Sequence, residues 1–161
     1  MSQLFSTKAG VILSPLLRRQ VAKTASRFCE ATGKQITVTD GLRTPRDQAC
    51  RLFEILKLDP DLSVYRNRAA ALEISREYLR SVAEGLDHQE IVARLNEIIT
   101  RQMSQGVFIS AHLTSLAVDV RCRDMSPTER TIFREIASQT ATKVLLESHP
   151  PHFHLEFAES S

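Results

Sequence analysis

LAVDVR, at residues 116–121, is the segment of the chain that decides the fold. Every second side chain in it is apolar, while Ala117 and Asp119 face the other way, as in a half-buried β-strand. The segment FHLEF at residues 153–157 alternates in the same manner. If the two strands pair, Asp119 and His154 fall on one face, and the small side chain of Ala117 leaves room beside them. The pattern therefore predicts a sheet with one apolar face and one polar face.

The rest of the chain supplies helices and strands in an irregular order. From their periodicity and capping residues we predict helices at 14–33, 44–58, 66–84, 88–103 and 126–140, and strands at 35–39 and 143–147. This order predicts an α+β fold with a small, mostly antiparallel central sheet flanked by helices. The helical pair at about 66–103 is inserted into it, and we expect residues 1–161 to form one domain. Within the pair, the apolar side chains expected to line the first helix are Leu72, Tyr78, Leu79 and Val82.

Composition and charge are those of an ordinary globular protein. Hydrophobic residues make up 42% of the 161 residues, charged residues make up 25%, and the net charge is only +2. This balance predicts no nucleic-acid binding, and no apolar run reaches the roughly 20 residues that a membrane span requires. The apolar stretch at 9–17 lacks a small-x-small cleavage site behind it, so we expect synthesis in the cytoplasm without a classical signal peptide.

The histidines near the two predicted strands indicate a metal site. His112 precedes the first of the two paired strands, and the segment HPPHFH at residues 149–154 leads into the second. Two imidazoles and one carboxylate suit a catalytic zinc ion, because they leave a fourth position open for water. His112, Asp119 and His154 are therefore the predicted metal ligands. The alternative is that the terminal histidines are ordinary polar surface residues.

A family resemblance favours the metal site. SAHLTSLAVD at 110–119 resembles the S-x-H-x-x-G-x-A-x-D signature of the zinc peptidoglycan peptidases related to D-alanyl-D-alanine carboxypeptidases, the LAS group. The closing segment PHFHLEF at 151–157 is similar to the group's H-x-H segment, and the spacing of 149–154 is similar to that of penicillin-insensitive murein endopeptidases. The resemblance implies zinc on His112, Asp119 and His154, with His152 as a catalytic or transition-state-stabilising residue.

A third motif extends the resemblance upstream. TDGLRTPRDQ at 39–48 resembles the group's S-G-Y-R-S-x-x-x-Q segment. The resemblance implies that Arg43 binds substrate and that Gln48 lines the site, and we assign Ser110 of the first motif to the substrate site as well. An arginine there could hold a substrate carboxylate in a bidentate fork.

Two departures from the family pattern concern conformation and catalysis. Ser115 stands where the signature has glycine, so a positive φ there would be costly. Some branches of the group have an acidic base three residues before the last ligand, and Pro151 occupies that position in this chain. The general base is therefore open among His152, Glu147 and His149.

These observations predict a zinc metallopeptidase, either a carboxypeptidase or an endopeptidase, that cleaves stem peptides or cross-links of bacterial peptidoglycan. The expected partner is a peptidoglycan peptide, the expected place of action is the periplasm or cell wall, and a phage lysis or secretion route would require a delivery or immunity protein. Two alternatives stay open: a non-catalytic zinc module that binds wall peptide or a protein, and an adaptor whose helical pair binds a secretion or phage component.

Overall fold

The computed structural model describes residues 4–148 and 150–158 and confirms the α+β class. The chain divides into two compact units. The first, called the sheet unit, contains the residues up to Leu42 together with those from Ser115 onward. The second, called the helical unit, is Arg43–Thr114. No helix in the described ranges has the length and apolar character to cross a membrane.

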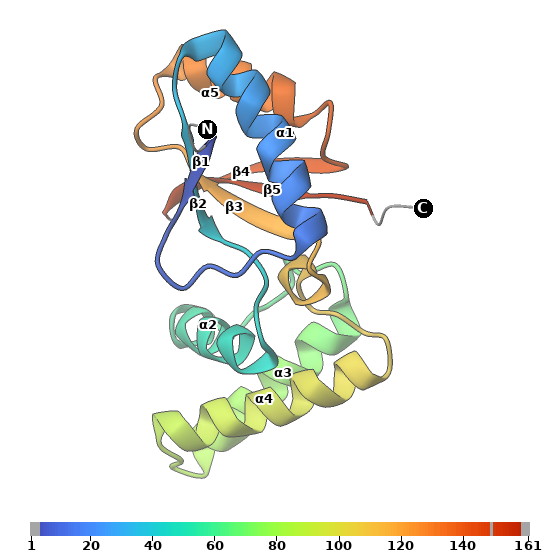
Figure 1. Cartoon of the computed structure of the whole chain (residues 1–161). Coiled ribbons are helices and arrows are strands. Elements are labelled where there is room, and N and C mark those ends of the chain that lie inside the picture. Colours follow the sequence, from blue (N-terminus) through green and yellow to red (C-terminus); the bar gives the residue numbers. More distant parts are fainter. Residues whose placement is uncertain (1–3, 149, 159–161) are drawn as a thin grey trace. The chain divides into compact units, whose positions relative to one another are not determined.

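The sheet unit contains five strands and two helices within the described ranges (Figure 1). They are β1 (Phe5–Thr7), α1 (Pro15–Thr32), β2 (Ile36–Asp40), β3 (Ala117–Arg121), α5 (Pro127–Ala137), β4 (Lys143–Ser148) and β5 (Pro151–Glu156). The strand order is β1-β2-β3-β5-β4. β1 pairs with β2 in parallel and every other pair is antiparallel, so the predicted mostly antiparallel sheet is confirmed. β1 was not predicted from the sequence, because its three residues are too few to show a period of two.

One face of this sheet is packed with apolar side chains. Val118 and Val120 of β3 are fully buried in a cluster with side chains of α1 and α5. Phe133 of α5 lies between Phe28 of α1, at a ring-centroid distance of 5.5 Å, and Phe153 of β5, at 4.9 Å. Burying each such ring contributes on the order of 2 kcal/mol. The alternation predicted for β3 and β5 is thereby confirmed, and their polar side chains face the opposite side of the sheet.

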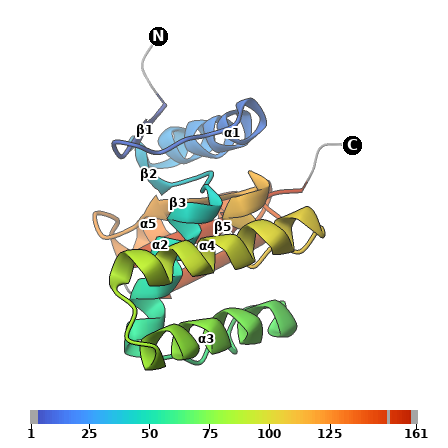
Figure 2. The ribbon, with the colours of Figure 1, turned by 90° about the horizontal axis from the view of Figure 1, so that it is seen from below.

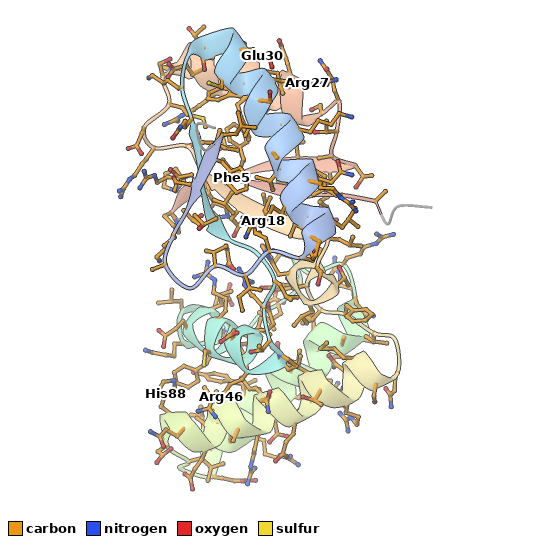
Figure 3. The ribbon with its side chains drawn as sticks, in the orientation of Figure 1. Phe5, Arg18, Arg27, Glu30, Arg46 and His88 are labelled. Atoms are coloured by element: carbon orange, nitrogen blue, oxygen red, sulfur yellow. The ribbon has the colours of Figure 1, made fainter. Side chains whose placement is uncertain are left out.

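The outer side of α1 is charged, as expected for a helix that covers a sheet. Figure 3 labels Arg18, Arg27 and Glu30 on this helix, and all three side chains are exposed. Figure 3 also labels Phe5 of β1, which is buried in the same apolar cluster. α1 begins after the cap Ser14, whose hydroxyl accepts from the amide of Leu17, and ends before Gly33 in the left-handed conformation.

The turn after β2 requires a glycine. A Cβ atom at Gly41 would lie 2.4 Å from the carbonyl oxygen of Ile12, which also accepts a hydrogen bond from the amide of Leu42 at 2.8 Å. Since the nearest obstacle is a backbone oxygen, a larger residue could fit only if one of the two segments moved. This contact anchors the end of β2 beside the segment that leads into α1.

The helical unit packs three helices around its own core. They are α2 (Pro45–Leu58), α3 (Arg68–Ala83) and α4 (His88–Ser104), followed by a 3₁₀ turn, η1 (Ala111–Thr114). Figure 2 shows α3 and α4 running alongside one another, and α2 also packs on α4. The core includes Leu52, Ile74, Leu95 and Ile99. The predicted helical pair is confirmed, and α4 begins with a capping box between Asp87 and Glu90.

The predicted inner face of α3 was wrong for three of its four residues, while Tyr78 packs against the core. Leu72, Leu79 and Val82 are about half exposed, and Tyr78 is only partly buried. The residues that α3 buries are mostly small or polar: Ala70, Ala71, Ile74, Ser75, Glu77 and Ser81. Small side chains allow α3 to approach its neighbours closely, so the larger apolar residues of this helix are left on its outer side.

Candidate metal centre

Two of the predicted metal ligands meet through strand pairing. Asp119 of β3 and His154 of β5 are direct partners in the antiparallel register. Both side chains lie on the polar face, because their neighbours Val118 and Phe153 are fully buried in the core on the other face. His154 Nδ1 is 3.0 Å from Asp119 Oδ1, and only about a tenth of each side chain is exposed, at 12% and 11%.

The third predicted ligand comes from the turn η1. His112 is buried, its amide donates to Ser110 Oγ at 3.3 Å, and its carbonyl accepts from the amide of Arg43 at 3.1 Å. One ligand atom each of His112, Asp119 and His154 lies within 4.8 Å of the other two, so these three residues could hold a metal ion. The predicted ligand set is thereby brought together.

The donor set fits a divalent metal ion. Zinc bonds of about 2.1 Å at tetrahedral angles place neighbouring ligand atoms about 3.4 Å apart. The 3.0 Å between His154 Nδ1 and Asp119 Oδ1 is of this order, and the ligand atoms of all three residues lie within 4.8 Å of one another. Two imidazole nitrogens and one carboxylate oxygen accept several divalent metals, so these residues could hold a metal ion without specifying which one.

The surroundings of His154 favour a positive charge. Burial by itself lowers the pKa of His154, but interactions with Asp119 and Glu156 outweigh this and hold the pKa above its ordinary value. Burial raises the pKa of Glu156, yet Lys143 and His154 bring it below the usual range. Glu156 is therefore held as a carboxylate beside the imidazole, and Asp119 lies on its other side, an arrangement that favours a cation at this position.

Two of the three candidate bases are in contact with each other. Glu147 of β4 and His152 of β5 are cross-strand partners, and Glu147 Oε2 lies 3.2 Å from His152 Nε2. The other ring nitrogen, Nδ1, donates to the Pro150 carbonyl at 2.6 Å, since a carbonyl can only accept. His152 Nε2 is also 3.6 Å from Asp119 Oδ2. The third candidate, His149, lies outside the described residues.

The predicted substrate residues belong to the helical unit. Arg43 Nη1 donates to Gln48 Oε1 at 3.0 Å, and Gln48 is fully buried at the start of α2. The other atom of this amide, Gln48 Nε2, has no hydrogen-bond partner in the described part of the chain. The side chains of Arg43 and Gln48 are thus joined by a hydrogen bond, and the amide of Arg43 donates to the carbonyl of His112. Their role toward substrate stays a prediction.

Two further residues, Glu156 and Lys143, lie on this face of the sheet and had no role predicted from the sequence. Glu156 Oε1 lies 3.2 Å from His154 Nε2, and Lys143 Nζ lies 3.0 Å from the same oxygen. The period of two already placed Glu156 on the face of His154. Lys143 could not be placed, because the register of β4 against β5 depends on the turn between them, which shows no clear signature in the sequence.

Ser115 has the positive φ that its place in the signature suggested. Its φ is 60°. Among the described residues, every other residue with a positive φ is a glycine. A non-glycine residue pays about 1–2 kcal/mol in this conformation, whereas glycine loses about 0.5–1 kcal/mol more backbone entropy on folding. The strain at Ser115 is thus not fully offset.

We expect Ser115→Gly to stabilise the protein by about 0.5–1 kcal/mol, because relief of the strained φ exceeds the added backbone entropy. Urea unfolding of the metal-free protein measures this change. Ser115→Val is the matched control and should destabilise, since a β-branched residue is least tolerant of positive φ. A loss of stability in Ser115→Gly would contradict the strained conformation.

Comparisons of the chain with protein-family models, with curated proteins and with solved structures give no match. The functional argument therefore depends on the residues themselves and on the motifs quoted above.

Proposed function

We propose that this protein is a zinc-dependent metallopeptidase that hydrolyses peptide bonds in the stem peptides or cross-links of bacterial peptidoglycan. The observation that carries the proposal is the cluster of His112, Asp119 and His154, with the side chains of His152 and Glu147 in contact beside Asp119. A structural metal site has no need of such a pair, whereas a hydrolytic site needs a group that moves a proton.

In the proposed hydrolysis, the metal ligands and the pair formed by His152 and Glu147 have separate roles. Zinc, when bound by His112, Asp119 and His154, supplies Lewis-acid activation of water and of the scissile carbonyl. His152 exchanges protons at Nε2, because its Nδ1 is held by the Pro150 carbonyl. Glu147, half exposed on the edge strand, accepts from that Nε2 and passes protons to or from solvent. This pair takes the place of the acidic base that Pro151 replaces.

Substrate recognition is assigned to Arg43. Stem peptides carry free carboxylates, and a guanidinium binds a carboxylate through two parallel hydrogen bonds. Gln48 accepts one N–H of the Arg43 guanidinium, which helps to orient the side chain. The peptidoglycan assignment itself is supported by the three motifs at 39–48, 110–119 and 151–157. Action in the periplasm or cell wall, with a delivery or immunity partner, follows from that assignment.

Digestion of purified peptidoglycan tests the proposal. Zinc-loaded protein is incubated with walls of several stem-peptide types, and released fragments are identified by mass spectrometry. We expect new peptide termini to appear with the loaded protein and to disappear after chelation, and the fragment masses will name the bond. A protein that binds one zinc ion but cleaves none of these walls would refute catalysis and leave the non-catalytic binding module.

A further inference from the structure

His154 has a hydrogen-bonding partner at each of its two ring nitrogens. Nδ1 faces Asp119 Oδ1 at 3.0 Å, and Nε2 faces Glu156 Oε1 at 3.2 Å. A neutral imidazole carries one proton, so one nitrogen donates while the other offers a lone pair. Asp119 belongs to the metal cluster and Glu156 does not, so the two nitrogens are inequivalent.

Glu156 is itself held in place by a lysine. Lys143 of β4 is its direct cross-strand partner, and Lys143 Nζ bonds the same oxygen, Oε1, at 3.0 Å. On the other side, Glu156 pairs with Ala117, whose small side chain leaves room for the carboxylate. The exposed fractions fall from 48% for the Lys143 side chain to 27% for Glu156 and 12% for His154. The three side chains form a chain of contacts from solvent to the buried metal ligand.

We propose that Glu156, held by Lys143, is the positioning residue for the metal ligand His154. Glu156 accepts the Nε2–H of His154, which leaves the lone pair of Nδ1 directed toward the metal beside Asp119. The negative charge of Glu156 also makes the imidazole a stronger donor to a cation. This inference rests on the proposed metal centre and adds to it a named ligand atom and a residue that sets metal affinity.

The neighbouring histidine on β5 has the opposite arrangement. His152 donates from Nδ1 to the Pro150 carbonyl, so its Nε2 is the nitrogen free to exchange protons. In the proposed arrangement His154 donates from Nε2 to Glu156, and its Nδ1, which faces Asp119, is the nitrogen that binds the metal. The two histidines share one face of one strand, and their partners assign them different functions.

Zinc affinity of four variants tests the inference, measured by competition with a chelator of known affinity. Glu156→Ala should weaken zinc binding by about 10- to 100-fold, as loss of the partner of a metal-binding histidine does. Glu156→Gln keeps an acceptor and should weaken it less. Lys143→Met should weaken it by about 2- to 5-fold, because an exposed ion pair contributes little. Glu147→Gln is the matched control: it removes the carboxylate that faces the other histidine and should leave zinc affinity unchanged.

Long-range ¹H–¹⁵N NMR of the histidine rings in the wild-type protein supplies a readout independent of activity. We expect His154 of the zinc-loaded protein to carry its proton on Nε2 and to show a zinc-dependent shift at Nδ1. Wild-type affinity in Glu156→Ala, or a zinc-dependent shift at Nε2, would overturn the inference. If circular dichroism shows that Glu156→Ala does not fold, the inference is tested by the zinc affinity of Lys143→Met and by the wild-type NMR spectrum. Wild-type protein that binds no zinc would instead refute the proposed function.

Discussion

His154→Ala is expected to abolish both zinc binding and peptidoglycan hydrolysis. The substitution removes one of three ligands and leaves Asp119 buried without its 3.0 Å partner. A metal centre contributes several kcal/mol to transition-state stabilisation, and each 1.4 kcal/mol is tenfold in rate. The rate should therefore fall by at least about 10³-fold. Metal content by mass spectrometry and fragment release from peptidoglycan measure the two effects on the same samples.

The exposed histidine His88 provides the control for this experiment. It lies at the start of α4 in the helical unit and stacks on Phe53, at a ring-centroid distance of 4.3 Å. Figure 3 labels it among the surface side chains. His88→Ala should keep one zinc ion per chain and full activity. Zinc retained at full occupancy and affinity in His154→Ala would refute the ligand assignment, even if activity were lost.

His152→Ala and Glu147→Gln are expected to reduce hydrolysis while zinc remains bound. Neither residue belongs to the metal cluster, and together they form the proton-transfer pair across β4 and β5. General acid–base groups contribute about 10²- to 10⁴-fold, and we expect His152→Ala to lose that much of kcat. Glu147→Gln should lose less, because the half-exposed carboxylate acts through His152.

The double variant separates a shared role from two independent ones. If Glu147 and His152 act as one unit, the double variant is no slower than His152→Ala alone, since the effects of coupled residues do not add. Multiplicative losses would show that the two residues act separately. Wild-type rates in His152→Ala with zinc bound would exclude this histidine as a proton carrier and leave His149 and Glu147 as the candidates.

Local patterns in the sequence were enough to predict most of the elements and the metal cluster. Strict alternation in 116–121 and 153–157 determined which side chains share a face, because a strand reverses the direction of its side chains at every residue. Capping residues such as Ser14, Asp87 and Ser126 located helix starts, because their side chains satisfy backbone amides only two or three residues away. The ligand set follows from these local features together with the spacing of the motifs.

Features that depend on contacts between distant segments were decided only by the tertiary structure. The strand β1 exists because β2 is there to pair with it, and α3 buries its small residues because α4 packs against that side. The register of β4 joins Glu147 to His152 and Lys143 to Glu156. A shift of one residue would have turned both side chains to the other face, and nothing within β4 itself specifies which register is adopted. The sequence by itself therefore determined which residues could bind a metal, and the strand pairing decided which residues support them.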